Sequence, residues 1–197
     1  MSANVVGTAG PKGSGGGHSS RPLWQEAISL AARAHRHQIR KDDRTPYIAH
    51  CVRVMTTLSQ VFGCRDEGVL CAAVLHDTIE DTTTDYDDLR KHFGTDVADL
   101  VAAMTKNMAL PEETREPAYD RQLASASWRA RLIKLADAYD NLCDSVTVPT
   151  EKQAKRKVDA LDKAERALAL VRGDLHEPTI AAGVEALRRL VGEERDR

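Results

Sequence analysis

The chain has 197 residues, which is enough for one domain with a substantial apolar core. Hydrophobic residues make up 42%, charged residues 29%, and the formal net charge is -2, so no overall field draws the protein to nucleic acid or to an anionic membrane. No apolar run approaches the roughly 18 residues of a membrane-spanning helix, and the N-terminus lacks the apolar segment of a secretory signal.

The first 20 residues differ in composition from the rest of the chain. Their segment TAGPKGSGGGHSS is rich in Gly and Ser and lacks apolar periodicity, which predicts a disordered extension over residues 1–20. From Pro22 onward apolar residues such as Ala27 and Ala31 recur at three- and four-residue steps, which predicts a helix. The polar segment KDDRTP separates this helix from a second one, which begins near Ile48.

The segment DEGVLCAAVLHDTIED, residues 66–81, is apolar on nearly every side before its last six positions. This pattern predicts a helix at the centre of a bundle. Thr84 is the expected N-cap of the next helix, and Gly94 is its expected C-terminal stop. Thr95 then begins another helix, whose apolar face consists of Val97, Leu100, Val101 and Met104.

The segment KNMALPEETREPAY, residues 106–119, is polar and is predicted to be a loop that closes over a substrate or faces it. Helical periodicity returns in SASWRARLIKLADAYDNL and continues through two amphipathic helices. The apolar positions of the last helix are Ile180, Val184, Leu187 and Val191. No segment has the pattern of a strand. We therefore predict an all-α fold, a compact multi-helix bundle that forms a single domain over residues 21–197.

The four cysteines do not form a CxxC pair, which argues against a zinc ribbon or a disulfide scaffold. We expect buried free thiols, because Cys71 lies within an apolar run and Cys143 follows a leucine. Free thiols are typical of a reducing compartment, so we expect a cytoplasmic protein.

The sequence HDTIED, residues 76–81, places an imidazole and three carboxylates at the end of an apolar segment. Residues three and four apart share a face of a helix, so Asp77 would lie beside Glu80 and Asp81. These carboxylates would repel one another unless a cation lay among them, and His and Asp are ligands that suit manganese, iron or zinc. The alternative is an acidic N-terminal region of the following helix without a metal, and this segment alone does not decide between the two.

Two further segments favour the metal hypothesis. His50 follows a Pro-Tyr turn at the start of its helix, and Asp137 lies on an otherwise apolar helix. Lys134 and Asn141 are one turn to either side of Asp137. A lone buried carboxylate is costly, so we expect a partner for it. Two imidazoles and two carboxylates on three helices could form one metal-binding pocket.

The order His…His-Asp…Asp resembles the HD superfamily of metal-dependent phosphohydrolases. The segments HRHQIRKDDRTPYIAH, AAVLHDTIEDT, HFGTDVADLVAAMTK and LIKLADAYDNL are similar, in order and spacing, to the motifs of the small alarmone hydrolases. Those enzymes are stand-alone relatives of the hydrolase half of RelA/SpoT-type enzymes. The resemblance extends from Trp24 to Ser145.

The resemblance implies roles for individual residues. The implied ligands of one manganese(II) ion per site are His50, His76, Asp77 and Asp137. The implied acidic pair that acts on the attacking water is Glu80 and Asp81. The implied substrate contacts are Arg40, Lys41, Tyr47, Lys134 and Asn141, with Lys106 as a further candidate. Without the resemblance, the RHQIRK segment would more often be a solvated helix end than an anion site.

The implied reaction is hydrolytic removal of the 3′-pyrophosphate of (p)ppGpp, which leaves GDP or GTP. The expected partner is a small-molecule nucleotide, with no nucleic acid and no membrane, and a homodimer is compatible with the sequence. The family usually has Pro in place of Cys51 and Arg in place of Cys143, and the loss of that guanidinium at Cys143 leaves the preferred base open. The alternatives are the same chemistry on (p)ppApp, phosphatase action on NADPH, and a non-catalytic nucleotide sensor.

Overall fold

The computed structural model describes residues 22–145 and 150–196, so the extension expected over residues 1–20 lies outside the described part. The elements in chain order are α1 (Leu23–Ala34), α2 (Ile48–Thr56), the π-helical turn η1 (Thr57–Val61), α3 (Glu67–Leu75), α4 (Thr78–Asp81), α5 (Tyr86–Met104), α6 (Glu112–Ser125), α7 (Trp128–Ser145), α8 (Thr150–Leu170), the 3-10 turn η2 (Arg172–Asp174) and α9 (Pro178–Asp196). Extended pairing in the described residues is limited to one isolated bridge between Ile39 and Pro46. The prediction of an all-α bundle is confirmed.

The helix α3 lies at the centre of the bundle, where it contacts α1, α2, α5 and α7. Its N-cap is Asp66, whose side chain accepts a hydrogen bond from the backbone N–H of Val69 at 3.1 Å. Its side chains from Cys71 to Leu75 are buried, as its apolar sequence predicts. Buried apolar side chains of the other long helices extend this core to α9, whose predicted seam is buried at all four positions.

The predicted third helix does not run unbroken to residue 81. The helix α3 ends at Leu75, and Asp77 has φ −98° and ψ 0°, in the sparsely populated region between helix and strand. The hydroxyl of Thr78 donates to the carbonyl oxygen of Leu75 at 2.7 Å and so occupies an acceptor that a continuing helix would use. The chain therefore turns at His76 and Asp77, and the short helix α4 begins afresh at Thr78.

The helix α5 confirms one predicted boundary and corrects another. The N-cap is Asp85 and not Thr84, because Asp85 and Asp88 form a reciprocal capping box with each other's backbone N–H groups. Gly94 interrupts the helix with φ 84° and ψ 169°, a conformation that glycine adopts without a steric penalty. The predicted stop at Gly94 and the restart at Thr95 are therefore confirmed.

The prediction of a loop over residues 106–119 was wrong in its second half. The helix α6 begins at Glu112, directly after Pro111, and its first turn carries two acidic residues. Pro117 lies inside this helix, and together with the polar composition it hides the periodicity that buries Tyr119 and Leu123.

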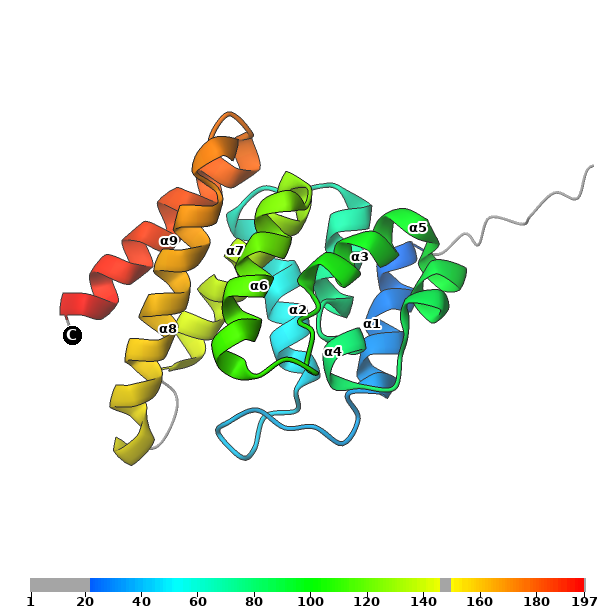
Figure 1. The fold of residues 1–197 in the computed structure, drawn as a ribbon, viewed down its shortest axis with the longest axis horizontal. Coiled ribbons are helices and arrows are strands. Elements are labelled where there is room, and N and C mark those ends of the chain that lie inside the picture. Colours follow the sequence, from blue (N-terminus) through cyan, green and yellow to red (C-terminus); the bar gives the residue numbers. More distant parts are fainter. Residues whose placement is uncertain (1–21, 146–149, 197) are drawn as a thin grey trace, which may run out of the picture.

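The helix α7 lies between two groups of helices. It packs against α2, α3 and α5 of the first group and against α8 and α9 of the second. Figure 1 shows α8 and α9 side by side at one end of the molecule, with α1 and α3 on the other side of α7. Side chains of α7 can therefore meet those of both groups. In the described part of the chain no helix combines the length and the apolar character needed to cross a membrane.

Candidate functional site

A cavity of about 450 Å³ opens where α7 faces α2, α4, α6 and α8. Polar and charged side chains dominate its wall. All of the residues singled out from the sequence line it, namely Arg40, Lys41, Tyr47, His50, His76, Asp77, Glu80, Asp81, Lys106, Lys134, Asp137 and Asn141. The structure thus brings every predicted site residue to one cavity, although these residues are spread over 102 positions of the sequence, from Arg40 to Asn141.

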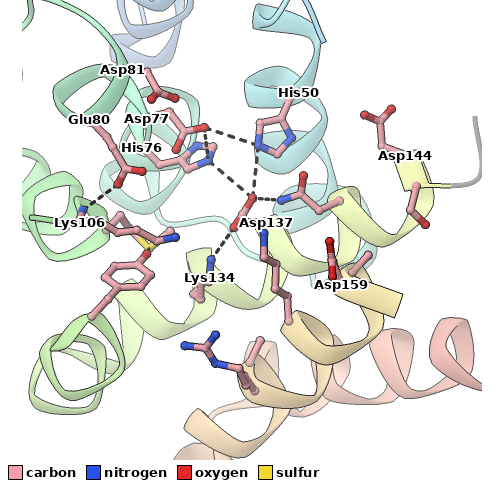
Figure 2. Close-up of a pocket in the computed structure, with 18 of the residues that line it drawn as sticks. His50, His76, Asp77, Glu80, Asp81, Lys106, Lys134, Asp137, Asp144 and Asp159 are labelled. Atoms are coloured by element: carbon pink, nitrogen blue, oxygen red, sulfur yellow. Dashed lines mark hydrogen bonds and ion pairs between the residues drawn. The ribbon is translucent and has the colours of Figure 1, made fainter. Parts of the chain in front are cut away.

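Two imidazoles and two carboxylates converge at the inner end of the cavity, as Figure 2 shows. The Nε2 atom of His50 lies 3.3 Å from Asp137 Oδ1 and 3.7 Å from Asp77 Oδ2. The Nε2 atom of His76 lies 3.0 Å from Asp77 Oδ2 and 3.8 Å from Asp137 Oδ1. His50, His76 and Asp137 can each offer a ligand atom within 4.8 Å of the others, and so can the buried Cys51 together with His76 and Asp77.

Hydrogen bonds on the far side of each imidazole direct its lone pair to the centre of this cluster. His76 Nδ1 lies 2.8 Å from the carbonyl oxygen of Ala73, which can only accept, and His50 Nδ1 lies 2.7 Å from Asp140 Oδ2. Both Nδ1 atoms are therefore hydrogen-bond donors, and the Nε2 atom of each ring is the one that can bind a cation once it carries no proton. The Nε2 atom of His76 is buried and has no hydrogen-bond partner among the described residues. This donor set fits a divalent metal ion.

The electrostatics of the cluster favour the same interpretation. Burial opposes ionisation of Asp77 and Asp137, but His76, His50 and Lys134 outweigh it and lower the pKa of both carboxyl groups. Burial would also lower the pKa of His76, yet Asp77 and Asp137 raise it to about 9. The carboxylates therefore hold protons on the imidazoles. A divalent cation bound in place of these protons would release the protons to solvent.

Asp137 has two further partners, as expected for a buried carboxylate. Lys134 Nζ lies 2.8 Å from Asp137 Oδ2, and Asn141 Nδ2 donates to Asp137 Oδ1 at 2.5 Å. Arg40 Nη2 donates in turn to Asn141 Oδ1 at 3.0 Å and to Asp144 Oδ2 at 2.8 Å. Lys134 and Asn141, both predicted as substrate contacts, thus hold the Asp137 carboxylate directly, and Arg40 acts on it through Asn141.

Tyr47 also contacts both a predicted metal ligand and a predicted substrate contact. Its hydroxyl donates to Asp77 Oδ2 at 2.7 Å, and its half-buried ring lies 5.4 Å from the guanidinium carbon of Arg40. Lys41 is exposed at the rim of the cavity. The structure therefore places Tyr47 against a predicted metal ligand and Lys41 closer to solvent.

The two remaining acids of the HDTIED sequence lie in different surroundings. Glu80 is half-buried, and its Oε2 accepts a hydrogen bond from the backbone N–H of Lys106 at 2.7 Å. Burial raises the pKa of Glu80, and the charges of Asp77 and Asp81 raise it further. Asp81 is exposed at the mouth of the cavity, and its pKa is raised as well, first by partial desolvation and then by Asp77. A carboxylate with a raised pKa is a better proton acceptor near neutral pH.

Sequence reasoning missed one wall of the cavity, which α8 supplies. Its basic residues Arg156, Lys163 and Arg166 line the side that faces α6 and α7. Desolvation lowers the pKa of Lys163, and the nearby positive charges of Lys134 and Lys106 lower it further. Arg156 and Lys163 are two helical turns apart, so their common face was visible in the sequence, but they lie beyond the segments that carry the resemblance.

Comparisons with known proteins identify relatives of this chain. The family model of the HD domain matches residues 27–162. The guanosine-3′,5′-bis(diphosphate) 3′-pyrophosphohydrolase MESH1 of Drosophila melanogaster is 41% identical over 152 residues, which cover 76% of this chain and 85% of that one. The Homo sapiens MESH1 is 45% identical over 120 residues, 60% of this chain and 67% of that one.

Two solved structures are also similar to this chain. One belongs to a metazoan ortholog of SpoT that hydrolyses ppGpp and plays a role in starvation responses; it is 36% identical, has a TM-score of 0.78, and the match covers 89% of this chain and 97% of that one. A crystal structure of a Listeria monocytogenes EGD-e protein is 28% identical with a TM-score of 0.62, and the match covers 77% of this chain and 97% of that one.

Proposed function

The chain belongs to the HD-domain family of small alarmone hydrolases, and from this premise we propose that it is a metal-dependent hydrolase that removes the 3′-pyrophosphate of (p)ppGpp. The products are GDP or GTP and pyrophosphate. The observation that carries the proposal is the cavity itself, which has a His and Asp cluster at one end and, on the side formed by α6 and α8, Lys and Arg side chains interspersed with the acidic residues Glu116, Asp120 and Asp159. A nucleotide with phosphate groups on its 3′ and 5′ oxygens could place one anionic group at the His and Asp cluster and the other at the facing wall.

The residues that we propose to hold the metal are His50, His76, Asp77 and Asp137. We propose a single manganese(II) ion, as the family resemblance implies; the carboxylate ligands suit this ion, although the donor set would also accept iron or zinc. When bound, the ion lowers the pKa of a water molecule and offsets charge on the phosphoryl oxygens. Tyr47 supports the site, because its hydroxyl holds the Asp77 carboxylate through the 2.7 Å hydrogen bond.

Glu80 is the proposed proton acceptor for the attacking water. The bond from the water oxygen to phosphorus forms as the bond from phosphorus to O3′ breaks; Glu80 takes the proton of the water, and O3′ takes up a proton from solvent and becomes the ribose hydroxyl. The backbone N–H of Lys106 holds one carboxylate oxygen of Glu80, which leaves the other free to receive the proton. Asp81, at the mouth of the cavity, is the proposed second acid of this pair.

The cations of the opposite wall are proposed to bind the phosphates that do not react. Lys163 of α8 and the exposed Lys41 line the cavity, and Arg156 of α8 donates to the carbonyl oxygen of Lys41 at 3.0 Å. Arg40 and Asn141 complete the wall between this region and the metal site. Phosphate oxygens would replace water around these cations in charge-assisted hydrogen bonds.

Product analysis tests the proposal. The purified protein, loaded with manganese(II), is incubated separately with ppGpp, ppApp and NADPH, and the released pyrophosphate and phosphate are measured. We expect pyrophosphate from ppGpp at the highest rate. Faster turnover of ppApp or of NADPH would move the substrate to another nucleotide with the same chemistry, and saturable binding of ppGpp without release of either product would indicate a sensor.

A reducing compartment such as the cytoplasm is the proposed location. All four cysteines are free, and burial raises the pKa of the Cys51 and Cys71 thiols, which makes them unreactive. The homodimer stays a prediction, and the mass of the protein in solution is the measurement that tests it.

A further inference from the structure

A buried carboxylate on α7 contacts His50 on the side away from the proposed metal. Asp140 is 3% exposed and lies one turn beyond Asp137, so both carboxylates point from α7 toward α2. Asp137 faces the Nε2 atom of His50 at 3.3 Å, and Asp140 faces its Nδ1 atom at 2.7 Å. The imidazole is therefore held from both sides by the same helix.

A guanidinium from α2 holds Asp140 in turn. Arg53 Nε donates to Asp140 Oδ1 at 2.6 Å, and Arg53 Nη2 donates to Asp140 Oδ2 at 3.0 Å and to Asp144 Oδ1 at 3.1 Å. Arg53 lies one turn after His50, so both side chains reach α7 from one face of α2. This fork satisfies both oxygens of a carboxylate that would otherwise be buried with a single hydrogen bond.

We propose that Asp140 and Arg53 are positioning residues for the metal site. Asp140 keeps the proton of His50 on Nδ1 and keeps Nε2 directed at the metal, while Arg53 holds the Asp140 carboxylate in the orientation that this contact needs. The inference rests on the proposed function only in requiring a divalent metal at His50. Carboxylates that accept a hydrogen bond from a ligating histidine orient the ring and raise its basicity, and their loss costs about 10–100-fold in metal affinity or activity.

The alternative is an ion pair that only ties α2 to α7. The chain contains a matched control for that role, because Arg131 of α7 forms the same fork with Asp174, with Nε at 2.6 Å and Nη2 at 2.8 Å. Asp174 is nearly buried, like Asp140, but its pair joins α7 to η2. Removing either carboxylate charge should destabilise the fold, whereas only Asp140 should affect the metal.

The experiment measures manganese(II) affinity, by electron paramagnetic resonance of the free ion, beside thermal unfolding. We expect Asp140→Asn to lower the affinity by about 10–100-fold. We expect Asp174→Asn to lower the melting temperature about as much as Asp140→Asn does. Its manganese(II) affinity should stay within about twofold of wild type, since the two sites are independent. Equal affinities for the two variants would overturn the inference.

The sign of the effect at Arg53 gives a second test. Removing a positive charge near a cation site should strengthen metal binding, whereas removing the group that orients Asp140 should weaken it. We expect Arg53→Gln to weaken manganese binding, and to add nothing in the Asp140→Asn background because Arg53 acts through Asp140. Stronger binding in Arg53→Gln would refute its positioning role.

These readouts separate the inference from the proposed function. If the wild-type protein binds manganese(II) but releases no pyrophosphate from ppGpp, the proposed reaction fails while the variant affinities still decide the role of Asp140. If the wild-type protein binds no divalent ion, both fail together.

Discussion

Replacing Glu80 by Gln changes the proposed proton acceptor and little else. The two side chains have nearly the same shape, and the amide oxygen of Gln can still accept the hydrogen bond that Lys106 N–H gives to Glu80 Oε2 at 2.7 Å. A neutral acceptor makes this hydrogen bond weaker by about 1 kcal/mol. The carboxylate also lies outside the set of proposed metal ligands. We therefore expect stability, manganese binding and nucleotide binding to change little.

The expected loss is in turnover. A positioned general base contributes about 10²–10⁴-fold to a proton-transfer step, so Glu80→Gln should raise the barrier by about 2.7–5.5 kcal/mol. The assay is release of pyrophosphate from ppGpp at saturating manganese(II), with the Kd of the nucleotide measured in parallel. Glu116→Gln is the matched control, because Glu116 lines the same cavity and binds the ammonium of Lys106 at 2.8 Å. Its kcat should stay within about threefold of wild type.

The pH dependence supplies an independent check on Glu80. Burial and the neighbouring acids raise its pKa, and the carboxyl group accepts a proton only when it is ionised. Activity should therefore decline, as the pH falls, at a higher pH than an ordinary glutamate would produce, and this decline should be absent from the residual activity of Glu80→Gln. Manganese(II) must stay saturating, since His76 also gains protons on acidification. Near-normal turnover in the Gln variant would refute the assignment.

Three further changes test the metal site, the cationic wall and the packing. His76→Ala should lower manganese(II) affinity by more than about 100-fold, beyond the loss typical of a residue that only supports a ligand, as isothermal titration can measure. Lys163→Gln should raise KM for ppGpp about 10-fold, and by less than about twofold for guanosine 3′-diphosphate, which lacks the 5′ phosphates; equal effects on both would refute its role. Gly183→Ala should destabilise the protein by about 1–3 kcal/mol in urea, because its Cβ would lie 2.7 Å from Leu135 Cδ2. Gly192→Ala in the same helix, where no described atom lies within 4 Å of the added Cβ, should be neutral or stabilising.

Local patterns allowed most of the long helices and the candidate metal ligands to be predicted, whereas the candidate substrate contacts and the acidic pair were implied by the family resemblance. The period of apolar residues indicates a buried face without knowledge of the neighbouring helix, as the burial of Ile180, Val184 and Leu187 demonstrates. A polar residue on an apolar segment likewise indicates a buried site without knowledge of the neighbouring helix. Asp137 stands out because a buried carboxylate needs a partner, and the structure supplies Lys134 and Asn141.

Contacts between helices distant in sequence could not be predicted in the same way. Asp140 and Arg53 are 87 positions apart, and no local pattern in the sequence indicates that they are partners. The wall formed by α8 depends on the packing of that helix against α7, which no local period encodes. The helix α6 was missed for a different reason, because Pro117 and a polar surface weaken the helical signal that tertiary packing of Tyr119 restores.

The break between α3 and α4 explains how one short sequence can hold so many acids. Adjacent side chains on a regular helix diverge by about 100°, so His76 and Asp77 would not reach the same cation from a continuous helix. The turn brings His76 Nε2 within 3.0 Å of Asp77 Oδ2 and starts α4 in a new direction. Asp77 then faces the imidazoles, Glu80 faces the N–H of Lys106, and Asp81 faces solvent. Carboxylates that would repel one another on one helical face thus have different surroundings, and Asp77 alone of the three belongs to the proposed metal site.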